Sequence, residues 1–348
     1  MRALVAMSGG VDSSVAAALM RDAGHEVVGV TLKMWSGPNG EAPTAGCCTV
    51  SDAEDARRVA GQLDVPYYVL DYTTEFRDGV VDRFISDYVS GRTPNPCIEC
   101  NRTVKFDRLL HRLDDFESDV LVTGHHARSR FDGLNWTLHR GADRLKDQSY
   151  VLSMLTQREL SRARFPVGEL TKPEVRSMAS SLGLRTAEKP ESMDICFVGR
   201  HDYRAFLSRT APEAFMPGPV VDTDGHELGA HEGIAGFTVG QRRGLGVAVG
   251  EPRFVVRLEP ATSTVVLGRR EELGVGGVEL SQVVWTAAGG RGEVMAQYRA
   301  HGDPVPAVLD GDRLLFTDLQ QGIAPGQTVA FYDGDRVLGG ALIAGTFV

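Results

Sequence analysis

The chain has 348 residues, of which 42% are hydrophobic and 24% are charged, and its formal net charge is −9. This length is more than a single hydrophobic core usually spans, so we expect two or three domains in an ordinary soluble globular protein. The negative net charge argues against a protein that coats nucleic acid without specificity.

The cysteine count and the hydropathy both point to the cytoplasm. Five cysteines are too few to form a disulfide framework for a chain of this size, so we expect catalytic or metal-binding thiols in a reducing compartment. No apolar run approaches the roughly 18 residues of a membrane span, and the chain begins with strand-like sequence instead of a signal peptide. We therefore expect a cytoplasmic protein with no membrane partner.

A glycine-rich motif, SGGVDSS at residues 8–14, follows the apolar residues 3–7. Its glycines let the backbone approach a ligand closely. Its last two serines stand directly before residues 15–20, whose apolar periodicity predicts a helix. Amide groups at the start of a helix bind anions, so the motif is suited to a polyphosphate. Its spacing matches neither the Walker A sequence nor the Rossmann fingerprint. A glycine-rich turn without a ligand is the alternative.

Strand-like and helix-like patterns alternate along the first part of the chain. This rhythm predicts an α/β domain with a parallel sheet. Because ligands of open α/β sheets bind at the carboxyl ends of the strands, we expect ATP beside residues 8–14 and Gly124. A later helix is predicted after Lys172, over residues 173–182. The predicted strands are residues 3–7, 26–33, 67–70 and 120–123, and the earlier helices end near residue 23 and span residues 51–63.

The pattern changes after about residue 200, where glycine-rich turns separate short β runs. Strands at this spacing predict small antiparallel domains, the last of them a barrel. We expect an ATP-binding catalytic domain over residues 1–200, a small β-rich central domain over 201–272 and a C-terminal β-barrel over 273–348. The β runs are residues 220–221, 254–258, 264–267, 278–285, 313–316, 328–332 and 337–344.

The cysteines carry the second strong signal. Cys97 and Cys100 form a CxxC after two prolines, and the helical pattern of residues 102–113 places Cys100 near a helix N-terminus, which favours a thiolate. Cys196 follows in an apolar segment, and the vicinal Cys47 and Cys48 lie in a polar loop without an assigned role. Half of a structural zinc site is one interpretation of CxxC. A catalytic pair of Cys100 and Cys196 and a cluster ligated by Cys97, Cys100 and Cys196 are the others.

Six motifs occur in the same order as in bacterial tRNA-specific 2-thiouridylases, which are N-type ATP pyrophosphatases (the MnmA family). The resemblance covers essentially the whole chain. It implies an adenine-nucleotide α-hydrolase-like, Rossmann-like first domain and a tRNA-contacting barrel. The motifs are SGGVDSS, GRTPNPCIECN with Lys105-Phe106, Thr123-Gly124-His125, Lys146-Asp147-Gln148-Ser149, SMDICF and GQRRGLG at residues 240–246.

The resemblance implies a tRNA-uridine 2-sulfurtransferase that adenylates O2 of the wobble uridine in glutamate, glutamine and lysine tRNAs. Sulfur would come from a cysteine desulfurase, a sulfur-relay protein or inorganic sulfide. Cys100 matches the catalytic nucleophile, Cys196 the persulfide carrier, and Asn95, Pro96 and Cys97 the segment at the target base. The implied nucleotide-binding residues are Ala6, Met7, Ser8, Gly9, Gly10, Val11, Asp12, Ser13, Leu32 and Gly124, and the implied tRNA contacts are His125, Lys146, Asp147, Gln148, Tyr298, Arg299 and Gln327.

Two questions of chemistry stay open at this point. Many family members have aspartate in place of Cys97, and with three thiols we favour a 4Fe-4S cluster over a persulfide relay that ends in a disulfide. Asp12 is suited to position Mg²⁺ on the phosphates of ATP. The rival functions are another ATP pyrophosphatase, such as an amidotransferase or ligase, and a non-enzymatic RNA-binding module with a structural zinc.

Overall fold

The computed structural model describes residues 1–37, 49–191, 195–198, 203–247, 250–287 and 289–348. Cys47 and Cys48 lie outside these residues, as do residues 192–194 of the motif before Cys196. None of the described helices combines the length and apolar character needed to cross a membrane.

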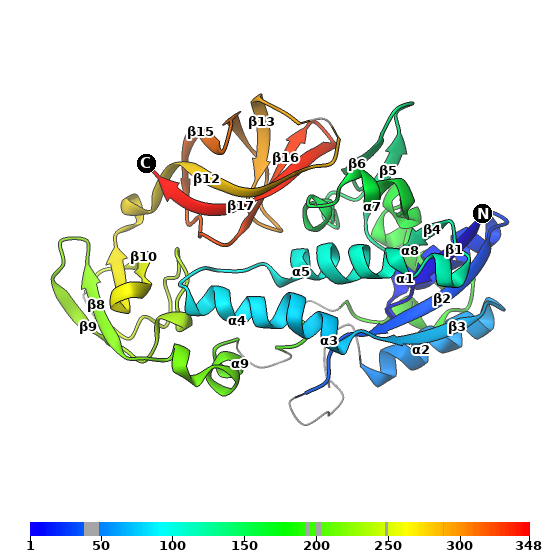
Figure 1. The fold of residues 1–348 in the computed structure, drawn as a ribbon, viewed down its shortest axis with the longest axis horizontal. Helices are drawn as coiled ribbons and strands as arrows, with labels where there is room; N and C mark the ends of the chain where they lie inside the picture. Colours follow the sequence, from blue (N-terminus) through cyan, green and yellow to red (C-terminus); the bar gives the residue numbers. More distant parts are fainter. Residues whose placement is uncertain (38–48, 192–194, 199–202, 248–249, 288) are drawn as a thin grey trace.

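A five-stranded, fully parallel sheet forms the first part of the molecule, as predicted (Figure 1). Its order is β3-β2-β1-β4-β7, so the chain moves outward from β1 in both directions. Apolar residues fill β1 and β4, whose central position buries both of their faces. The strands are β1 (Arg2–Ala6), β2 (Glu26–Lys33), β3 (Tyr67–Asp71), β4 (Val120–Val122) and β7 (Ala163–Arg164); only β7 was not predicted.

Helices cover both faces of this sheet. On one face, α1 (Val11–Asp22), α2 (Val50–Gln62) and α8 (Lys172–Ser181) pack against Val5 and its neighbours. On the other face lies a larger core built around two long helical segments, which contact each other. The first segment joins α3 (Thr73–Phe76), η1 (Arg77–Val81) and α4 (Asp82–Val89); the second joins α5 (Pro96–Glu99), η2 (Cys100–Arg108) and α6 (Leu109–His111).

The middle of the chain forms a smaller sheet with its own core, which includes Val220, Val255 and Leu267. The strand order is β10-β11-β8-β9, and β8 and β11 pair in parallel. The β runs predicted at residues 220–221, 254–258 and 264–267 are confirmed. The elements are α9 (Tyr203–Thr210), β8 (Gly218–Asp222), β9 (Glu227–His231), β10 (Phe254–Glu259) and β11 (Thr264–Gly268).

The C-terminal part is a closed six-stranded antiparallel barrel, as predicted (Figure 1). Pairing of β12 with β17 closes it, and β17 also pairs with β6 of the hairpin β5–β6, which follows β4 of the parallel sheet in the chain. One continuous sheet therefore joins the barrel to this hairpin. The strands are β5 (Ala127–Phe131), β6 (Trp136–Arg140), β12 (Gly274–Trp285), β13 (Gly292–Gln297), β14 (Val305–Asp310), β15 (Arg313–Gln321), β16 (Thr328–Asp333) and β17 (Arg336–Phe347).

Short helical segments make the remaining connections. Of these, α7 (Gln157–Arg162) begins at a capping box formed by Thr156 and Glu159. The single-turn segments are η3 (Asp114–Phe116), η4 (Tyr150–Leu152), η5 (Pro166–Glu169), η6 (Arg185–Glu188), η7 (Pro212–Ala214), η8 (Ile234–Gly236), η9 (Pro260–Thr262) and η10 (Arg270–Leu273).

Candidate active site

The SGGVDSS loop connects β1 to α1 at the carboxyl edge of the parallel sheet. Gly10 is the N-cap residue of α1 and offers no side-chain acceptor, so the amide groups of the first helical turn face the loop. Gly9 has φ +71°, and a Cβ there would lie 2.1 Å from the carbonyl oxygen of Asp52. Only glycine fits both conditions. The backbone amides and the helix dipole make this turn suitable for an anion such as the phosphates of ATP.

Hydrogen bonds between serines fix the shape of this loop. Ser13 Oγ accepts the amide of Ser8 at 3.1 Å and lies 3.2 Å from Ser8 Oγ. Gly124, at the end of β4, lies so close that a Cβ there would be 2.5 Å from the amide nitrogen of Ser13. The predicted nucleotide residues Ser8, Ser13 and Gly124 are therefore neighbours in space.

Other predicted nucleotide residues contribute to the core. The side chains of Met7, Val11 and Leu32 are buried, and Ala6 ends β1. Any contact that Met7 or Val11 makes with a nucleotide would therefore come from the backbone. Their nucleotide-binding role stays a prediction.

Asp12, on the first turn of α1, is bound to two basic side chains. Lys172 Nζ donates to both carboxylate oxygens, at 2.7 and 2.9 Å, and His126 Nε2 lies 3.1 Å from Oδ1. Burial raises the pKa of Asp12, but hydrogen bonds from His126 and Lys172 outweigh it and hold this pKa below its ordinary value. Asp12 is therefore an ionised partner of the Lys172 ammonium.

This arrangement does not fit the predicted magnesium site as it stands. Mg²⁺ prefers carboxylate oxygens whose lone pairs face the ion, whereas both oxygens of Asp12 accept hydrogen bonds from Lys172. The side chain of Lys172 is only 8% exposed, so its charge is directed to this site. A role of Asp12 in holding Mg²⁺ stays a prediction.

Lys172 also joins the loop to the segment that leads to Cys196. Its ammonium lies 3.0 Å from Glu191 Oε1, and Lys146 Nζ donates to Glu191 Oε2 at 2.8 Å. The hydrogen bond from Lys146, with a further one from Lys172, holds the pKa of Glu191 below its ordinary value. Asp12, Lys172, Glu191 and Lys146 thus form one chain of ion pairs. Of these four residues, only Asp12 and Lys146 had a role predicted from the sequence.

A second lysine anchors the same segment to α2. Lys189 Nζ donates to Asp52 Oδ1 at 2.7 Å and to Asp55 Oδ2 at 2.6 Å. Asp52 is the residue whose carbonyl group touches Gly9. Residues 189–191, which precede Cys196 in the chain, are therefore held by ion pairs to α2 and to the SGGVDSS loop.

His125, a predicted tRNA contact, is buried in the structure. Its Nδ1 lies 2.7 Å from Thr123 Oγ1, and its ring packs near Phe106 and Phe165. Burial lowers the pKa of His125 to about 3, so the side chain is neutral at pH 7. Contact of His125 with RNA stays a prediction.

Acidification is expected to destabilise the protein through His125. Its pKa is about 3 in the folded chain and roughly 6.5 in the unfolded chain, so between these pH values the unfolded state binds more protons. Stability therefore falls as pH drops below about 6.5, by up to about 1.4 kcal/mol per pH unit. Urea unfolding at pH 7.5, 6 and 5 should show that the free energy of unfolding falls less steeply with decreasing pH in His125→Gln than in the wild-type protein. Equal slopes for both proteins would contradict this assignment.

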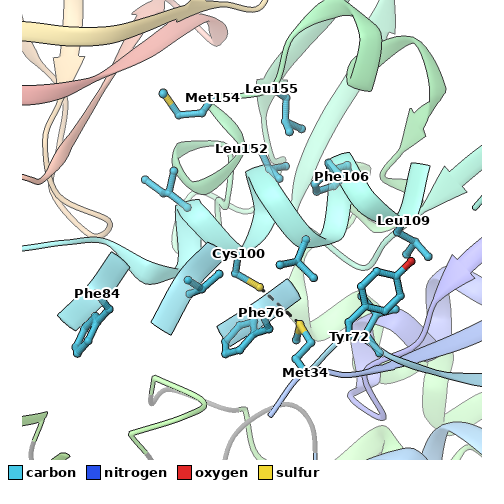
Figure 2. Close-up of a cluster of buried hydrophobic side chains, with 14 of the residues drawn as sticks. Met34, Tyr72, Phe76, Phe84, Cys100, Phe106, Leu109, Leu152, Met154 and Leu155 are labelled. Carbon is cyan, nitrogen blue, oxygen red and sulfur yellow. Dashed lines mark hydrogen bonds between the residues drawn. The ribbon is translucent and has the colours of Figure 1, made fainter. Parts of the chain in front are cut away.

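The CxxC motif lies at the start of the helical segment formed by α5 and η2. Asn95 is the N-cap residue and accepts the amide of Ile98, and Pro96 occupies the first turn, where its missing N–H costs nothing. Cys97 is exposed, whereas Cys100 is buried and donates to Met34 Sδ at 3.7 Å. Figure 2 shows the Cys100 side chain pointing from the helix toward Met34.

Cys196 is half-buried and packs against the core that contains Cys100. Its neighbour Phe197 anchors this position, because the Phe197 ring lies 5.0 Å from Phe84 and 6.0 Å from Trp35. The two cysteines predicted to be catalytic therefore border the same hydrophobic core.

The three thiols have the ligand chemistry of an iron–sulfur site. Cys97 is exposed, while Cys100 points into a hydrophobic cluster toward Met34. Among the described residues, the one group of three side chains close enough to share a single metal ion is Asp222, Asp224 and His226, which does not involve cysteine. Each thiolate of a 4Fe-4S cluster binds its own iron atom, so this spacing does not bear on a cluster. Ligation by Cys97, Cys100 and Cys196 stays a prediction.

The remaining predicted tRNA contacts fall into two groups. Asp147 and Gln148 hold their own loop, since Asp147 accepts the amides of Gly141 and Ser149 and Gln148 accepts the amide of His126. A second group, Tyr298, Arg299 and Gln327, lines a pocket of about 680 Å³ at the base of the barrel.

Gln327 contacts the chain just before the predicted target-base segment, Asn95–Cys97, from the barrel side. Its Nε2 donates to the carbonyl oxygen of Thr93 at 2.9 Å, and the amide of Thr93 donates to the carbonyl of Pro325 at 2.8 Å. Gly326 lies between them, where a Cβ would be 3.0 Å from Thr93 N. The barrel therefore holds the chain two residues before Asn95.

Family models cover most of the chain in three consecutive pieces. They are described as a tRNA methyl transferase HUP domain over residues 1–200, a tRNA methyl transferase PRC-barrel domain over 204–269 and an aminomethyltransferase beta-barrel domain over 276–343. A tRNA-specific 2-thiouridylase MnmA from Roseiflexus sp. (strain RS-1) is 47% identical over 98% of each chain. This chain belongs to the tRNA-specific 2-thiouridylase family.

Other relatives agree with this membership. The thiouridylases of Chloroflexus aggregans and Zymomonas mobilis are 46% and 44% identical, over 98% and 99% of this chain and 98% and 94% of theirs. The domain descriptions refer to methyl transfer, whereas these thiouridylases, alike over their full length, are named for thiolation. A solved 4-thiouridine synthetase–RNA complex with bound ATP has 17% identity and a TM-score of 0.38, over 61% of this chain and 50% of that one, too distant to bear on function.

Proposed function

We propose that this protein converts the wobble uridine of glutamate, glutamine and lysine tRNAs to 2-thiouridine, with ATP split to AMP and pyrophosphate. The observation that carries this proposal is the chain of ion pairs from Asp12 through Lys172 to Glu191. It joins an anion-binding loop to Glu191, which stands five residues before a half-buried cysteine in the chain, and this supports one site for activation and sulfur delivery.

The chemistry proceeds in two steps. First, O2 of the uridine attacks the α-phosphorus of ATP, an O–P bond forms and pyrophosphate leaves. AMP then becomes the leaving group at C2, which is otherwise a poor site for substitution. Holding both reactants in one site supplies much of the rate, and the uridine must be unstacked to expose C2. The stiff residues 93–96, held by the barrel, are suited to position the extruded base.

In the second step, the terminal sulfur of a persulfide on Cys196 attacks C2 and AMP departs. Cys100, as thiolate, then attacks Cys196 Sγ, which breaks the bond to the transferred sulfur and leaves a Cys100–Cys196 disulfide. An external thiol reduces this disulfide. The sulfane sulfur comes from a cysteine desulfurase or a sulfur-relay protein, with inorganic sulfide as the alternative source for a cluster route. Half-burial of Cys196 beside the core of Cys100 supports this relay.

The direct test is a thiolation assay. The protein, purified without oxygen, is incubated with ATP, Mg²⁺, a sulfur source and unmodified glutamate, glutamine or lysine tRNA. Mass spectrometry of the digested tRNA should show 2-thiouridine, in amounts equal to the AMP released. ATP splitting without 2-thiouridine, under every sulfur source, would contradict the proposal and favour another ATP pyrophosphatase.

Cys97 decides between the relay and a cluster. Since Cys97 is exposed whereas Cys100 is buried, we expect Cys97→Asp to keep the thiolation rate within a few-fold of wild type and to make that rate independent of added iron. The measurement is 2-thiouridine yield with and without anaerobic iron and sulfide reconstitution. Loss of activity together with loss of iron-dependent absorption would instead establish the cluster.

A further inference from the structure

The GQRRGLG motif at residues 240–246 has no role in the reaction described above. Its first part lines the same pocket as Arg299 and Gln327 of the barrel. Thr93 and Arg204 line it as well, so four separate parts of the sequence meet around a space of about 680 Å³.

Glycines shape this pocket by letting backbone and guanidinium groups approach closely. Gly240 has φ +89°, and a Cβ there would lie 3.2 Å from the Cα of Gly322. Gly322 has φ +64°, and its Cβ would be 2.7 Å from Arg299 Nη2. Gly244 has φ +69°, and a Cβ there would lie 3.5 Å from Arg204 Nη1. Side chains at these positions would strain the backbone or displace the arginines.

The pocket is positively charged in an acidic protein. Arg204, Arg243 and Arg299 line it, and none of the described residues that line it is acidic. Arg299 is held by the carbonyl oxygens of Gln321 and Gly322, at 2.7 and 2.9 Å. Arg243 is exposed, and in the described part of the chain no carboxylate forms a salt bridge with it. Gln241 fixes the turn by donating to the carbonyl of Arg243.

The aromatic side chains of the pocket are used for packing within the protein. Tyr203 stacks on Tyr88 with ring centroids 4.8 Å apart, and the Tyr298 ring packs against Phe316 at 5.8 Å, with the Arg299 guanidinium 5.5 Å from its centroid. A nucleobase would need an open ring face to stack on. The lining therefore suits phosphate and ribose groups better than bases.

The pocket begins next to the target-base segment. Thr93 lines it and receives the hydrogen bond from Gln327. Asn95 follows two residues later, which is about 7 Å of extended chain. A ligand that fills the pocket therefore lies beside the place where the extruded base would be held.

Arg299 and Gln327 are tRNA contacts that the family resemblance already implies; we propose that Arg243 of the GQRRGLG motif is a further contact in this pocket, which binds a phosphate of the RNA backbone next to the target base. This inference rests on the proposed function, because it takes tRNA as the substrate. The motif thus becomes part of RNA positioning, and the central domain takes part in it together with the barrel.

The matched variants are Arg243→Gln and Arg242→Gln. Both residues are exposed and adjacent, so the charge change is equal, but Arg242 lines a different pocket. We expect Arg243→Gln to bind unmodified tRNA about tenfold more weakly than the wild-type protein. The slope of its log binding constant against log salt concentration should be smaller in magnitude by about one. The substitution should raise the KM for tRNA with little change in kcat. Arg242→Gln should stay close to wild type in both.

Binding is measured with intact protein at several salt concentrations between about 50 and 200 mM. Equal affinities and salt slopes for the two variants would overturn the inference. Weaker ATP binding by Arg243→Gln, with RNA affinity unchanged, would also overturn it by assigning a nucleotide to the pocket. If the wild-type protein binds tRNA but makes no 2-thiouridine, the proposed function fails while the pocket is still judged by the binding data.

Discussion

Replacing Cys196 by serine is expected to abolish 2-thiouridine formation, by a factor of roughly 10³ or more, because a hydroxyl cannot carry sulfane sulfur. Pyrophosphate release from ATP in the presence of tRNA should persist, since the loop at residues 8–14 is intact. Cys196 is only half-buried and is fixed by its neighbour Phe197, so the variant should fold. The measurement pairs 2-thiouridine yield with pyrophosphate release.

Cys100→Ser should block thiolation too, but at a different point. The persulfide on Cys196 would still form, so radioactive sulfur should stay bound to the protein. Because Cys100 is buried against Met34, a serine hydroxyl there costs about 1–3 kcal/mol of stability, which thermal melting would detect. Cys97→Ser, the same exchange at an exposed position, is the control. Thiolation by Cys196→Ser at more than a tenth of the wild-type rate would contradict the relay.

Local patterns were enough to predict the parallel sheet. In β1 and β4 every central residue is buried, so the apolar run itself marks the strand. The hairpin β5–β6 was missed, because its strands are polar on the exposed side and are fixed by pairing with β17, about two hundred residues later. Such pairing leaves no trace in a window of a few residues.

The residues of the candidate site also divide into those that local sequence patterns predict and those that only the folded chain brings together. Gly9 and Gly10 were recognisable because a backbone constraint demands glycine at fixed spacing. Lys172 was not, since it stands at the start of α8 behind a capping box of Thr171 and Glu174, where a lysine is ordinary. Only the folded chain brings it to Asp12, 160 residues away. Gln327 was assigned through family resemblance, which does not reveal its hydrogen bond to Thr93, 234 residues away.

Lys172→Met is expected to cut the activation step by at least a hundredfold. The Lys172 ammonium is directed to the anion-binding loop and is only 8% exposed, and it is the group that joins Asp12 to Glu191. Its loss removes positive charge where the pyrophosphate develops and releases the segment that leads to Cys196. The measurement is ATP-dependent AMP formation with saturating tRNA, together with the KM for ATP.

The stability of the variant separates a structural role of Lys172 from a catalytic one. Methionine leaves the Asp12 carboxylate, whose side chain is 28% exposed, without its ammonium partner, which costs up to about 3 kcal/mol. Lys172→Met combined with Asp12→Asn removes this unpaired charge, so the double variant should regain melting temperature but not activity. A purely structural lysine would let both recover together.

A charge-matched control tests whether the position of Lys172 matters more than its charge. Lys189→Met removes the same charge from a lysine that pairs with Asp52 and Asp55 on the other side of the loop. It should retain most of the activation rate, and Lys172→Arg should restore part of it, since a guanidinium keeps the charge but not the reach within a buried space. Equal losses for the two methionine variants would mean that the lysines only hold the segment in place. A selective loss at Lys172 would identify its ammonium as the group that serves both the phosphates and the approach to Cys196.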